Sequence, residues 1–447
     1  MHAAALLLAT VLSAEEGNRL VLALFEKDAR VRKEAREALV KADDPSLAPA
    51  LVECVFFAGE GGEDAALVLE SLLKKKGPRS YKFWLEALAQ RTDLVAKPGY
   101  AAFKGAQYAR IDPRFADWLK EGVPWTIRLE EVVFGGVRKD GIPALRNPKR
   151  VAATDRAASG FTENEKVFGV VVNGVARAYP LRFLDWHEMV NDVVGGRTVT
   201  LSYCTLCGSG ILFDTTPAEG ETYTFGSSGL LYRSNKLMYD HQTNSLWSNL
   251  TGEPVAGPLA GKGKRLAVLP LVVSTWGEWK SRHPATEVLS FDTGHRRDYA
   301  PGAAYGSYQS NQSLMFPVPA PPPPGYAPKG LVVSATAGGQ RKGYRLDDLV
   351  RQRVLNDQIG RVPVVLVTSA VDDAVRVYGR GSAPLAAKEG GTLVEEGSGT
   401  IFRVAEEGLF AEGETQPRHP RLPSHLLYWF AWHAHFGDSP LYRATPR

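Results

Sequence analysis

Two cysteines three residues apart are the side chains of this sequence with the clearest potential for chemistry. Cys204 and Cys207 stand in the segment 202–210, which reads SYCTLCGSG. Redox proteins use this spacing with a nucleophilic first cysteine, and metal knuckles use it to bring both sulfurs to one ion at about 2.3 Å. The glycines after Cys207 and the apolar residues 211–213 predict a β-strand. This favours a strand–knuckle–strand over a thioredoxin-like strand–helix.

One pair of cysteines supplies only half of a tetrahedral metal site, so other residues would have to complete it. His187 and His241 offer imidazoles, and Met238 offers a thioether. Two thiolates with an imidazole and a thioether suit soft ions, Cu(I) above all and then zinc. Glu188 and Asp240 are candidates to orient a metal ligand through hydrogen bonds. Each histidine taken alone is more often structural than a ligand.

An internal repeat separates scaffold residues from residues that could do chemistry. When the chain is shifted by 165 positions, matching residues of two copies meet without a gap over about 40 residues. The matches include Gly174/Gly339, Tyr179/Tyr344, Leu181/Leu346, Asn191-Asp192/Asn356-Asp357, Gly195/Gly360 and Leu201/Leu366. The pair Trp276 and Trp279 has a counterpart in Trp429 and Trp432 at a shorter offset, so the second copy has lost material before it.

The chemical residues of the first copy have no counterparts in the second. His187, Glu188, Cys204 and Cys207 correspond to Gln352, Arg353, Ser369 and Asp372. Every metal-type or redox-type group of this stretch is replaced together. We therefore interpret the repeat as one active and one degenerate copy of a module that reads strand, glycine turn, strand, short helix, Asn-Asp-x-x-Gly turn and strand.

The first part of the chain has helical periodicity. Asp28 can cap a helix that begins at Ala29. Helices are predicted over residues 29–39, 47–55, 65–73 and 81–88. This pattern resembles HEAT-type helix pairs, modules that usually bind protein partners or pack as a cap, so a protein partner is one expectation for this region. Cys54 lies on its apolar face and is predicted to be a buried, inert thiol.

After about residue 93, glycine, proline and alternating β-branched residues become frequent, which predicts strands. The sequence therefore predicts an α+β fold, in which an all-α HEAT-like N-terminal domain precedes an internally duplicated, mostly β module. The predicted parts are a signal peptide at 1–14, a helical domain at 15–95, a first unit with the cysteines at 96–315, a proline-rich linker at 316–330 and a degenerate second unit at 331–447.

Composition excludes several classes of protein. The 53 Lys and Arg residues against 49 Asp and Glu residues leave a formal charge of +4 over 447 residues, so no nucleic-acid partner is indicated. No apolar run is long enough to predict a membrane span. Three cysteines are too few for a disulfide scaffold. No nucleotide cofactor is indicated, because the glycine-rich segment 225–229 lacks the Gly-Lys-Ser/Thr ending of a phosphate-binding loop.

The apolar run at residues 3–14 has the length of a signal-peptide core, which predicts a periplasmic or extracellular protein. The basic residues that usually precede such a core are missing. The alternative is therefore a cytoplasmic protein in which this run begins the first helix.

Taken in order, the motifs resemble the bacterial family DUF3179. The resemblance rests on ARAYP at 176–180, WHE at 186–188, the SYCxxCG segment, FGxSGLLY at 225–232, MYD at 238–240 and SLW at 245–247, and it covers roughly residue 123 to the C-terminus. The name denotes unknown function, so it implies kinship alone, although members often look exported. Thr205 stands where the family usually has proline, and His241 where it usually has arginine. His187 is therefore a better ligand candidate than His241.

Three functions follow from these residues. The leading hypothesis is an exported protein that binds copper or zinc through Cys204, Cys207 and His187, with Met238 as a further ligand, either as a carrier or as a catalyst. The second is a thiol–disulfide oxidoreductase with Cys204 as nucleophile, Cys207 as resolving thiol and His187 as base. The third is a binding or scaffold module in which the cysteines form a static disulfide or a zinc clip. Whether the protein is an enzyme stays open at this stage.

Overall fold

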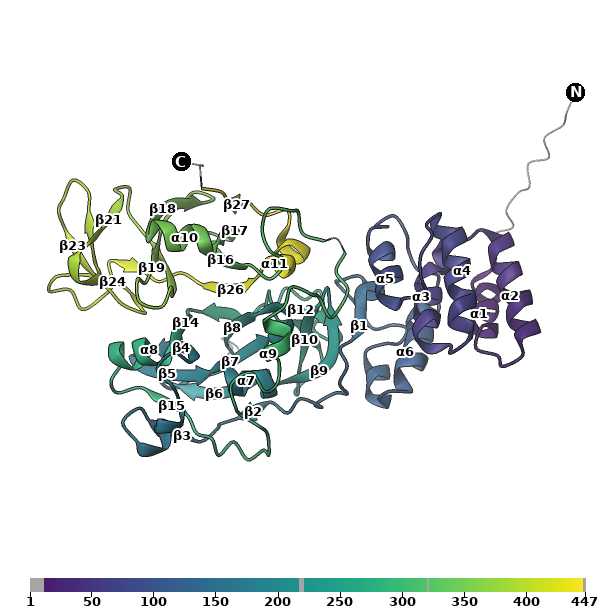
Figure 1. Ribbon diagram of the computed structural model, residues 1–447, viewed down its shortest axis with the longest axis horizontal. Helices are drawn as coiled ribbons and strands as arrows, with labels where there is room; N and C mark the ends of the chain where they lie inside the picture. Colours follow the sequence, from purple (N-terminus) through teal and green to yellow (C-terminus); the bar gives the residue numbers. More distant parts are fainter. Residues whose placement is uncertain (1–11, 217–220, 320, 445–447) are drawn as a thin grey trace, which may run out of the picture.

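The computed structural model describes residues 12–216, 221–319 and 321–444 (Figure 1). Most of the predicted signal peptide falls in residues 1–11, outside the described residues. A helical part lies at one end of the molecule, and two β-rich units lie one above the other at the other end (Figure 1). The fold is therefore α+β with a helical N-terminal region, as predicted.

The helical part consists of short amphipathic helices packed in succession. Its helices are α1 (Ala14–Ala23), α2 (Ala29–Ala42), α3 (Ala48–Phe57), α4 (Gly61–Leu73), α5 (Tyr81–Ala89) and α6 (Tyr100–Ala109). The predicted cap is present, because the Asp28 carboxylate accepts a hydrogen bond from the Arg30 N–H at 2.8 Å. Cys54 is fully buried in α3, and burial raises the pKa of its thiol well above the ordinary value. The prediction of a buried thiol is confirmed.

The first β-rich unit is built on two five-stranded sheets with the orders β14–β4–β5–β15–β3 and β13–β8–β7–β6–β2. Its strands are β2 (Leu145–Arg146), β3 (Arg150–Ala152), β4 (Lys166–Val172), β5 (Val175–Pro180), β6 (Met189–Val194), β7 (Arg197–Cys204), β8 (Ser209–Asp214), β13 (Ala267–Leu269), β14 (Val272–Thr275) and β15 (Glu287–Leu289). Helix α7 (Leu181–His187) links β5 to β6, and α8 (Trp276–Arg282) follows β14.

The second unit repeats these elements. Four of them, β16 (Leu331–Ala337), β17 (Gln340–Arg345), α10 (Leu346–Gln352) and β18 (Val354–Ile359), begin and end 165 residues after β4, β5, α7 and β6. The others are β19 (Val362–Thr368), β20 (Val375–Gly379), β26 (Ser424–Tyr428), α11 (Trp429–Phe436) and β27 (Leu441–Tyr442). Glycines with left-handed backbone recur at the same places, with φ of 55° at Gly195 and 58° at Gly360. The predicted duplication is confirmed.

One detail of the predicted repeat is wrong. The Asn191-Asp192 pair was expected in a turn, but both residues lie within strand β6, paired with Thr200 and Val199 of β7. The turn itself is made by Gly195 and Gly196, whose positive φ of 55° and 78° suits glycine.

Each unit carries its own inserted sheet. In the first unit, β9 (Phe225–Tyr232), β10 (Asn235–Asp240), β11 (Leu246–Ser248) and β12 (Pro254–Ala256) follow β8, with β1 (Val132–Phe134) paired to β9. In the second, β21 (Leu385–Lys388), β22 (Thr392–Glu395), β23 (Ile401–Val404), β24 (Gly408–Ala411) and β25 (His419–Pro420) follow β20. The first insertion is the one that reaches the cysteines.

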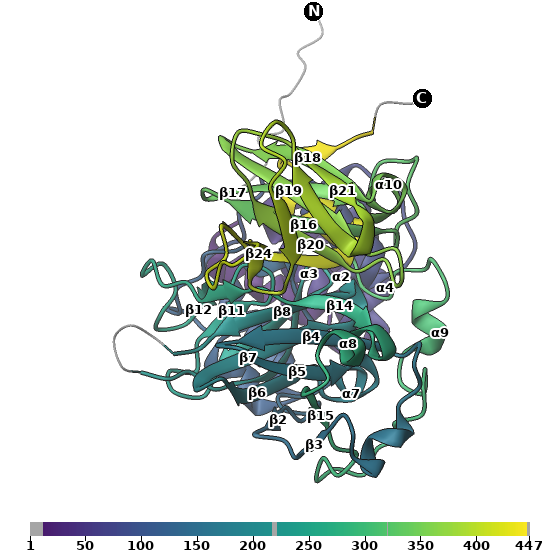
Figure 2. The ribbon, with the colours of Figure 1, turned by 90° about the vertical axis from the view of Figure 1, so that its left-hand side faces the viewer.

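The two units contact each other reciprocally. Strand β26 of the second unit packs near β8 of the first, and β14 of the first packs near β20 of the second (Figure 2). Because β26 is the counterpart of β14, and β20 is the counterpart of β8, each unit offers the same surface to the other. The turn before β8 and the turn before β20 therefore both lie at this interface.

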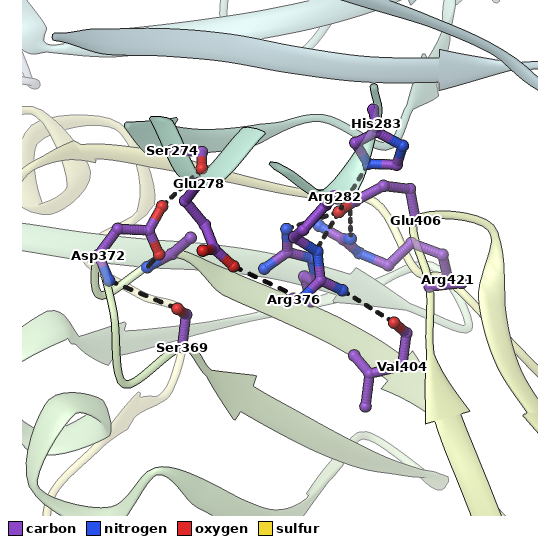
Figure 3. A network of polar contacts seen from close by, with 12 residues as sticks. Ser274, Glu278, Arg282, His283, Ser369, Asp372, Arg376, Val404, Glu406 and Arg421 are labelled. Carbon is purple, nitrogen blue, oxygen red and sulfur yellow. Dashed lines mark hydrogen bonds and ion pairs between the residues drawn. The ribbon is translucent and has the colours of Figure 1, made fainter. Parts of the chain in front are cut away.

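A buried polar network fastens the second unit to the first (Figure 3). The Glu406 carboxylate pairs with Arg376 at 2.5 Å and with Arg421 at 3.0 Å, and it lies 3.8 Å from His283 of the first unit. Beside it, the Asp372 carboxylate accepts hydrogen bonds from the Ser274 hydroxyl at 2.5 Å and from the Thr275 N–H at 3.0 Å. The residue that replaces Cys207 in the second unit thus holds the two units together.

Candidate functional site

The two cysteines lie on a tight turn between neighbouring antiparallel strands. Cys204 is the last residue of β7, residues 205–207 form a 3₁₀ turn, and β8 begins at Ser209. Gly208 between them has φ of +60°, and a β-carbon there would lie 3.1 Å from the Tyr428 ring. Both the conformation and the close approach favour glycine. The predicted strand–knuckle–strand is confirmed.

Both sulfur atoms face the same main-chain oxygen. The carbonyl oxygen of Ser234 lies 3.3 Å from Cys207 Sγ and 3.8 Å from Cys204 Sγ. Ser234 belongs to the two-residue turn between β9 and β10, where its φ is 63°. The cysteines are 1% and 0% exposed, so the inserted sheet closes the thiol pair from one side.

The protein treats the two thiols unequally. Burial acts to raise the pKa of Cys204, but hydrogen bonds from the Cys207 thiol and from the backbone N–H groups of Lys236 and Cys207 lower the pKa below the ordinary value. Burial, together with the adjacent Cys204 sulfur, raises the pKa of Cys207 well above the ordinary value. The surroundings of the pair therefore favour ionisation of Cys204 over ionisation of Cys207.

A buried lysine lies close enough to Cys204 for their charges to interact. Lys236 Nζ donates to the Glu188 carbonyl oxygen at 2.8 Å and lies 3.7 Å from Glu188 Oε2. Lys236 is 3% and Glu188 7% exposed. Burial lowers the pKa of Lys236, while the charges of Glu188 and Cys204 act to raise it. A lysine at this place is a source of the positive charge that favours a thiolate.

Sequence reasoning included Glu188 but missed Lys236. Nothing in the sequence around Lys236 marks it, because a lysine between Asn235 and Leu237 resembles many strand residues. Its separation from Glu188 by 48 positions hides the pair. The only available signal was the alternation of β10, which places Lys236 on the same face as the buried Met238.

Aromatic and acidic side chains cover the turn from another side. The Tyr308 hydroxyl donates to the Leu206 carbonyl at 2.9 Å, and Tyr308 lies in the short helix α9 (Gly306–Gln309). From the same helix, Gln309 Nε2 donates to Asp185 Oδ1 at 3.2 Å. Burial raises the pKa of Asp185 to about 7. The helix that covers the turn is thus bonded to a carboxyl group that can exchange a proton at neutral pH.

His187 lies next to Glu188 in the chain, but both of its ring nitrogens are engaged elsewhere. Nδ1 lies 2.8 Å from the Pro143 carbonyl oxygen, and Nε2 lies 2.6 Å from the Tyr299 hydroxyl. Burial lowers the pKa of His187 to about 4, so the ring is neutral at pH 7. In this arrangement His187 orients the Pro143 and Tyr299 segments and has no nitrogen left for the cysteines.

Comparison with known proteins agrees with the motifs. A family model described as "Protein of unknown function (DUF3179)" matches residues 139–439, more than half of the chain. The chain belongs to DUF3179. No curated protein and no solved structure gives a match.

The two departures of this DUF3179 protein from its family pattern occupy different surroundings. Thr205 is the first residue of the 3₁₀ turn, a position that proline tolerates, so either residue suits the turn. His241 lies on the far end of β10, where its Nε2 is 2.5 Å from Arg146 Nη2 and its ring packs against Tyr239. An arginine at this position is not required by the thiol pair.

Asp240 and Met238 of the DUF3179 motif have structural surroundings. The Asp240 carboxylate accepts hydrogen bonds from the Thr243 hydroxyl at 2.8 Å and from Trp247 Nε1 at 2.8 Å, which organises the turn between β10 and β11. Met238 is fully buried in the apolar cluster that also contains both cysteines. Met238 therefore shares the neighbourhood of the thiols, and Asp240 does not orient a residue of the thiol pair.

Within residues 12–216, 221–319 and 321–444, no three side chains of His, Cys, Asp or Glu are grouped as they would be around a metal ion. In the same part of the DUF3179 chain, no helix is both long and apolar enough for a bilayer span. The site that the structure describes is thus a buried cysteine pair with Lys236 and Glu188 beside it.

Proposed function

We propose that this DUF3179 protein is a thiol–disulfide oxidoreductase with Cys204 as nucleophile and Cys207 as resolving thiol. The observation that carries the proposal is the placement of both sulfurs on one tight turn, facing the Ser234 carbonyl oxygen, where hydrogen bonds lower the pKa of Cys204 and burial raises the pKa of Cys207. A dithiol that reacts with disulfides needs one thiolate to attack and one thiol to resolve the mixed disulfide.

The reaction proceeds in two exchanges that balance. The Cys204 thiolate attacks one sulfur of a substrate disulfide, and the other sulfur leaves as a thiolate that takes up a proton. The Cys207 thiol then loses its proton and attacks Cys204 Sγ, which releases the second substrate thiol. The substrate gains two electrons and two protons, and Cys204 and Cys207 become a disulfide.

Lys236, Glu188 and Asp185 have separate tasks in this scheme. The Lys236 ammonium stabilises the Cys204 thiolate, and Glu188 holds the ammonium in place through two oxygen atoms. The carboxyl of Asp185, with its pKa raised to about 7 by burial, is suited to accept a proton when Cys207 becomes a thiolate. His187 was expected to be the base, but its ring nitrogens are bound to Pro143 and Tyr299.

The segments that pack over the thiols limit the access of a substrate to them. Both cysteines are almost fully buried beneath the turn at Ser234 and the helix α9 that carries Tyr308. A disulfide substrate reaches Cys204 only when part of this cover moves. An exported protein would meet such substrates, because disulfides persist in oxidising compartments.

The proposal is tested by the reduction potential of the pair and by a trapping variant. The full chain is equilibrated in buffers of oxidised and reduced dithiothreitol, alkylated and analysed by mass spectrometry. We expect a reversible two-electron transition that Cys54→Ser retains and Cys204→Ser lacks. The Cys207→Ser variant is expected to accumulate a mixed disulfide with glutathione at Cys204. A pair that stays reduced in every buffer would contradict the proposal.

A second candidate function is the binding of a soft metal ion by the two sulfurs. It is supported by their convergence on one carbonyl oxygen and by the N–H groups directed at Cys204 Sγ, which suit thiolate ligands. Copper or zinc would need a further ligand from Met238 or from outside the described residues. Metal content by mass spectrometry on anaerobically purified protein, with Cu(I) and Zn(II) added back, tests this candidate. One ion per chain that is lost in Cys204→Ser/Cys207→Ser would favour metal binding over disulfide exchange.

We also infer that the helical part binds a protein partner. Leu22, Phe56 and Leu67 on its helices are between 41% and 50% exposed, which is a large exposure for such side chains. Affinity capture with the full chain and with a Phe56→Ser/Leu67→Ser variant tests this inference. A specific partner that the variant retains fully would contradict it.

A further inference from the structure

Residues 305–318 connect the cover of the thiols to the helical part, and we call this segment the strap. The strap begins with helix α9, where the Tyr308 hydroxyl donates to the Leu206 carbonyl oxygen at 2.9 Å. Leu206 lies in the 3₁₀ turn between the two cysteines. The start of the strap is therefore bonded to the turn that carries the sulfurs.

The other end of the strap holds the second part of the cover. The carbonyl oxygens of Phe316 and Pro317 lie 2.9 and 3.1 Å from the Ser234 hydroxyl, which donates to them. Ser234 is also the residue whose carbonyl oxygen faces both sulfurs. Both groups that close the thiol pair are thus fastened by the same segment.

Beyond the thiol cover, the strap is attached to helix α5 of the helical part. Lys82 Nζ donates to the Leu314 carbonyl oxygen at 2.9 Å, a charge-assisted hydrogen bond. One turn later on α5, Glu86 Oε1 accepts from the Val318 N–H at 3.5 Å. Val318 is 4% exposed and lines a narrow gap together with Leu85 of α5. Helix α5 therefore holds the strap by polar and apolar contacts.

Between these attachments the strap has little structure of its own. Apart from α9, its residues form no helix or strand, and all of them are described. Met315 in its middle is 54% exposed. The turn at Ser234, by contrast, joins the paired strands β9 and β10. A segment without strand pairing and with few buried side chains opens at a lower free energy than paired strands.

We propose that helix α5 restrains the strap and thereby controls the access of a disulfide to Cys204. Release from α5 frees the segment that binds the Ser234 hydroxyl and allows α9 to move away from the turn. The role of this control rests on the proposed thiol function, because access matters only to a pair that reacts. The opening of the strap itself does not depend on that function.

Alkylation of the native full chain with iodoacetamide, followed by mass spectrometry of the cysteine peptides, tests the proposal. Lys82→Met removes the hydrogen bond to Leu314 and should increase the alkylation rate of Cys204 about tenfold. Val318→Ala removes apolar contact with α5 and should change the rate in the same direction. Rates are measured as a function of pH, because a change in access scales the rate at every pH whereas a change in pKa shifts the profile.

The chain supplies an internal reference and a matched control. Cys54 is buried in α3 of the helical part, and its alkylation rate should stay the same in both variants. Lys166→Met removes another hydrogen bond from a lysine to a main-chain carbonyl, that of Asp372 at 3.2 Å, and should leave the rate at Cys204 unchanged. Thermal melting confirms that each variant is folded.

Two results would overturn the proposal. One is an unchanged alkylation rate of Cys204 in both Lys82→Met and Val318→Ala. The other is a parallel increase at Cys54, because the whole helical part would then have loosened. Alkylation requires no electron transfer, so a pair that stays reduced in every redox buffer would contradict the proposed function and leave the result for the strap intact.

Discussion

The turn that carries Cys204 and Cys207 and the turn that carries Ser369 and Asp372 share one backbone. Gly208 and Asp373 follow the two turns, and both have φ of 60°. In the first unit the Tyr203 N–H donates to the Glu188 carbonyl at 2.7 Å, and in the second the Thr368 N–H donates to the Arg353 carbonyl at the same distance. The duplicated scaffold therefore forms the same turn whether or not it carries cysteines.

The two turns differ in the segments of the chain that pack against them. The first turn faces the inserted strand β10, which brings Lys236 to Glu188 and Cys204. In the second, Arg353 replaces Glu188 and donates to the Ser369 carbonyl oxygen at 2.6 Å, while Asp372 bonds to the neighbouring unit. One copy of the turn is arranged for thiol chemistry and the other for assembly of the two units.

The largest expected effect is on disulfide formation, which should depend on the first turn and not on the second. Cys204→Ser should remove the disulfide-forming capacity of the protein completely, because no other described cysteine lies beside Cys207. Mass spectrometry after oxidation and alkylation measures it. Ser369→Ala, at the matched position of the second turn, should leave disulfide formation unchanged. If this variant also lost disulfide formation, the two turns would not differ in function as proposed.

The second unit should lose the most stability on substitution of Glu406, which lies between β23 and β24. Glu406→Ala leaves Arg376 and Arg421 buried without a carboxylate, so it should lower the free energy of unfolding by about 3–5 kcal/mol. Urea denaturation measures this loss. Glu407→Ala, at the exposed neighbouring position, is the control and should change stability little.

Glu406 should also make the free energy of unfolding depend on pH in the acid range. Burial acts against ionisation of Glu406, but the charges of Arg376 and Arg421 hold its pKa well below the ordinary value. Its stabilisation is therefore complete above the unfolded pKa of about 4.3 and is lost as pH falls through the lower folded pKa. Denaturation between pH 3 and pH 6 should show a flatter profile for Glu406→Gln than for the unmodified chain. Parallel profiles would contradict this assignment.

A smaller loss of stability is expected at Asp372. Asp372→Ala leaves the Ser274 hydroxyl and the Thr275 N–H without their acceptor, at a cost of about 1–3 kcal/mol. A double-mutant cycle with Ser274→Ala isolates the shared hydrogen bond. The pKa of Cys204 should stay the same in both variants, and a shift would show that the two turns are coupled.

The smallest effect concerns the electrostatics of the first turn. Lys236→Met removes the amine whose charge interacts with Cys204 and should raise the pKa of this thiol. The rate of alkylation of Cys204 as a function of pH measures it. Lys236→Arg should restore much of the shift, and Lys342→Met in the second unit should have no effect. An unchanged alkylation profile in Lys236→Met would remove lysine from the proposed site.

Local sequence was sufficient for much of this protein. Pattern and spacing predicted three features, because each is set by residues close together in the chain or by a regular offset. They are the cap at Asp28, the repeat offset of 165 residues and the turn around Gly208. The cysteine pair and Glu188 were predicted as site residues because they disappear together from the second copy.

The partners of the thiols were decided by the tertiary structure. Lys236 reaches Cys204 through pairing of an inserted sheet, and His187 turns toward Pro143 and Tyr299 although it adjoins Glu188 in the chain. The physical reason is that the direction of a buried side chain depends on the polar groups available within hydrogen-bond distance, and these come from segments far apart in sequence. By itself the sequence determined which turn carries the sulfurs, and the packing of distant strands decided which groups surround them, so that the pKa of Cys204 is lowered and the pKa of Cys207 is raised.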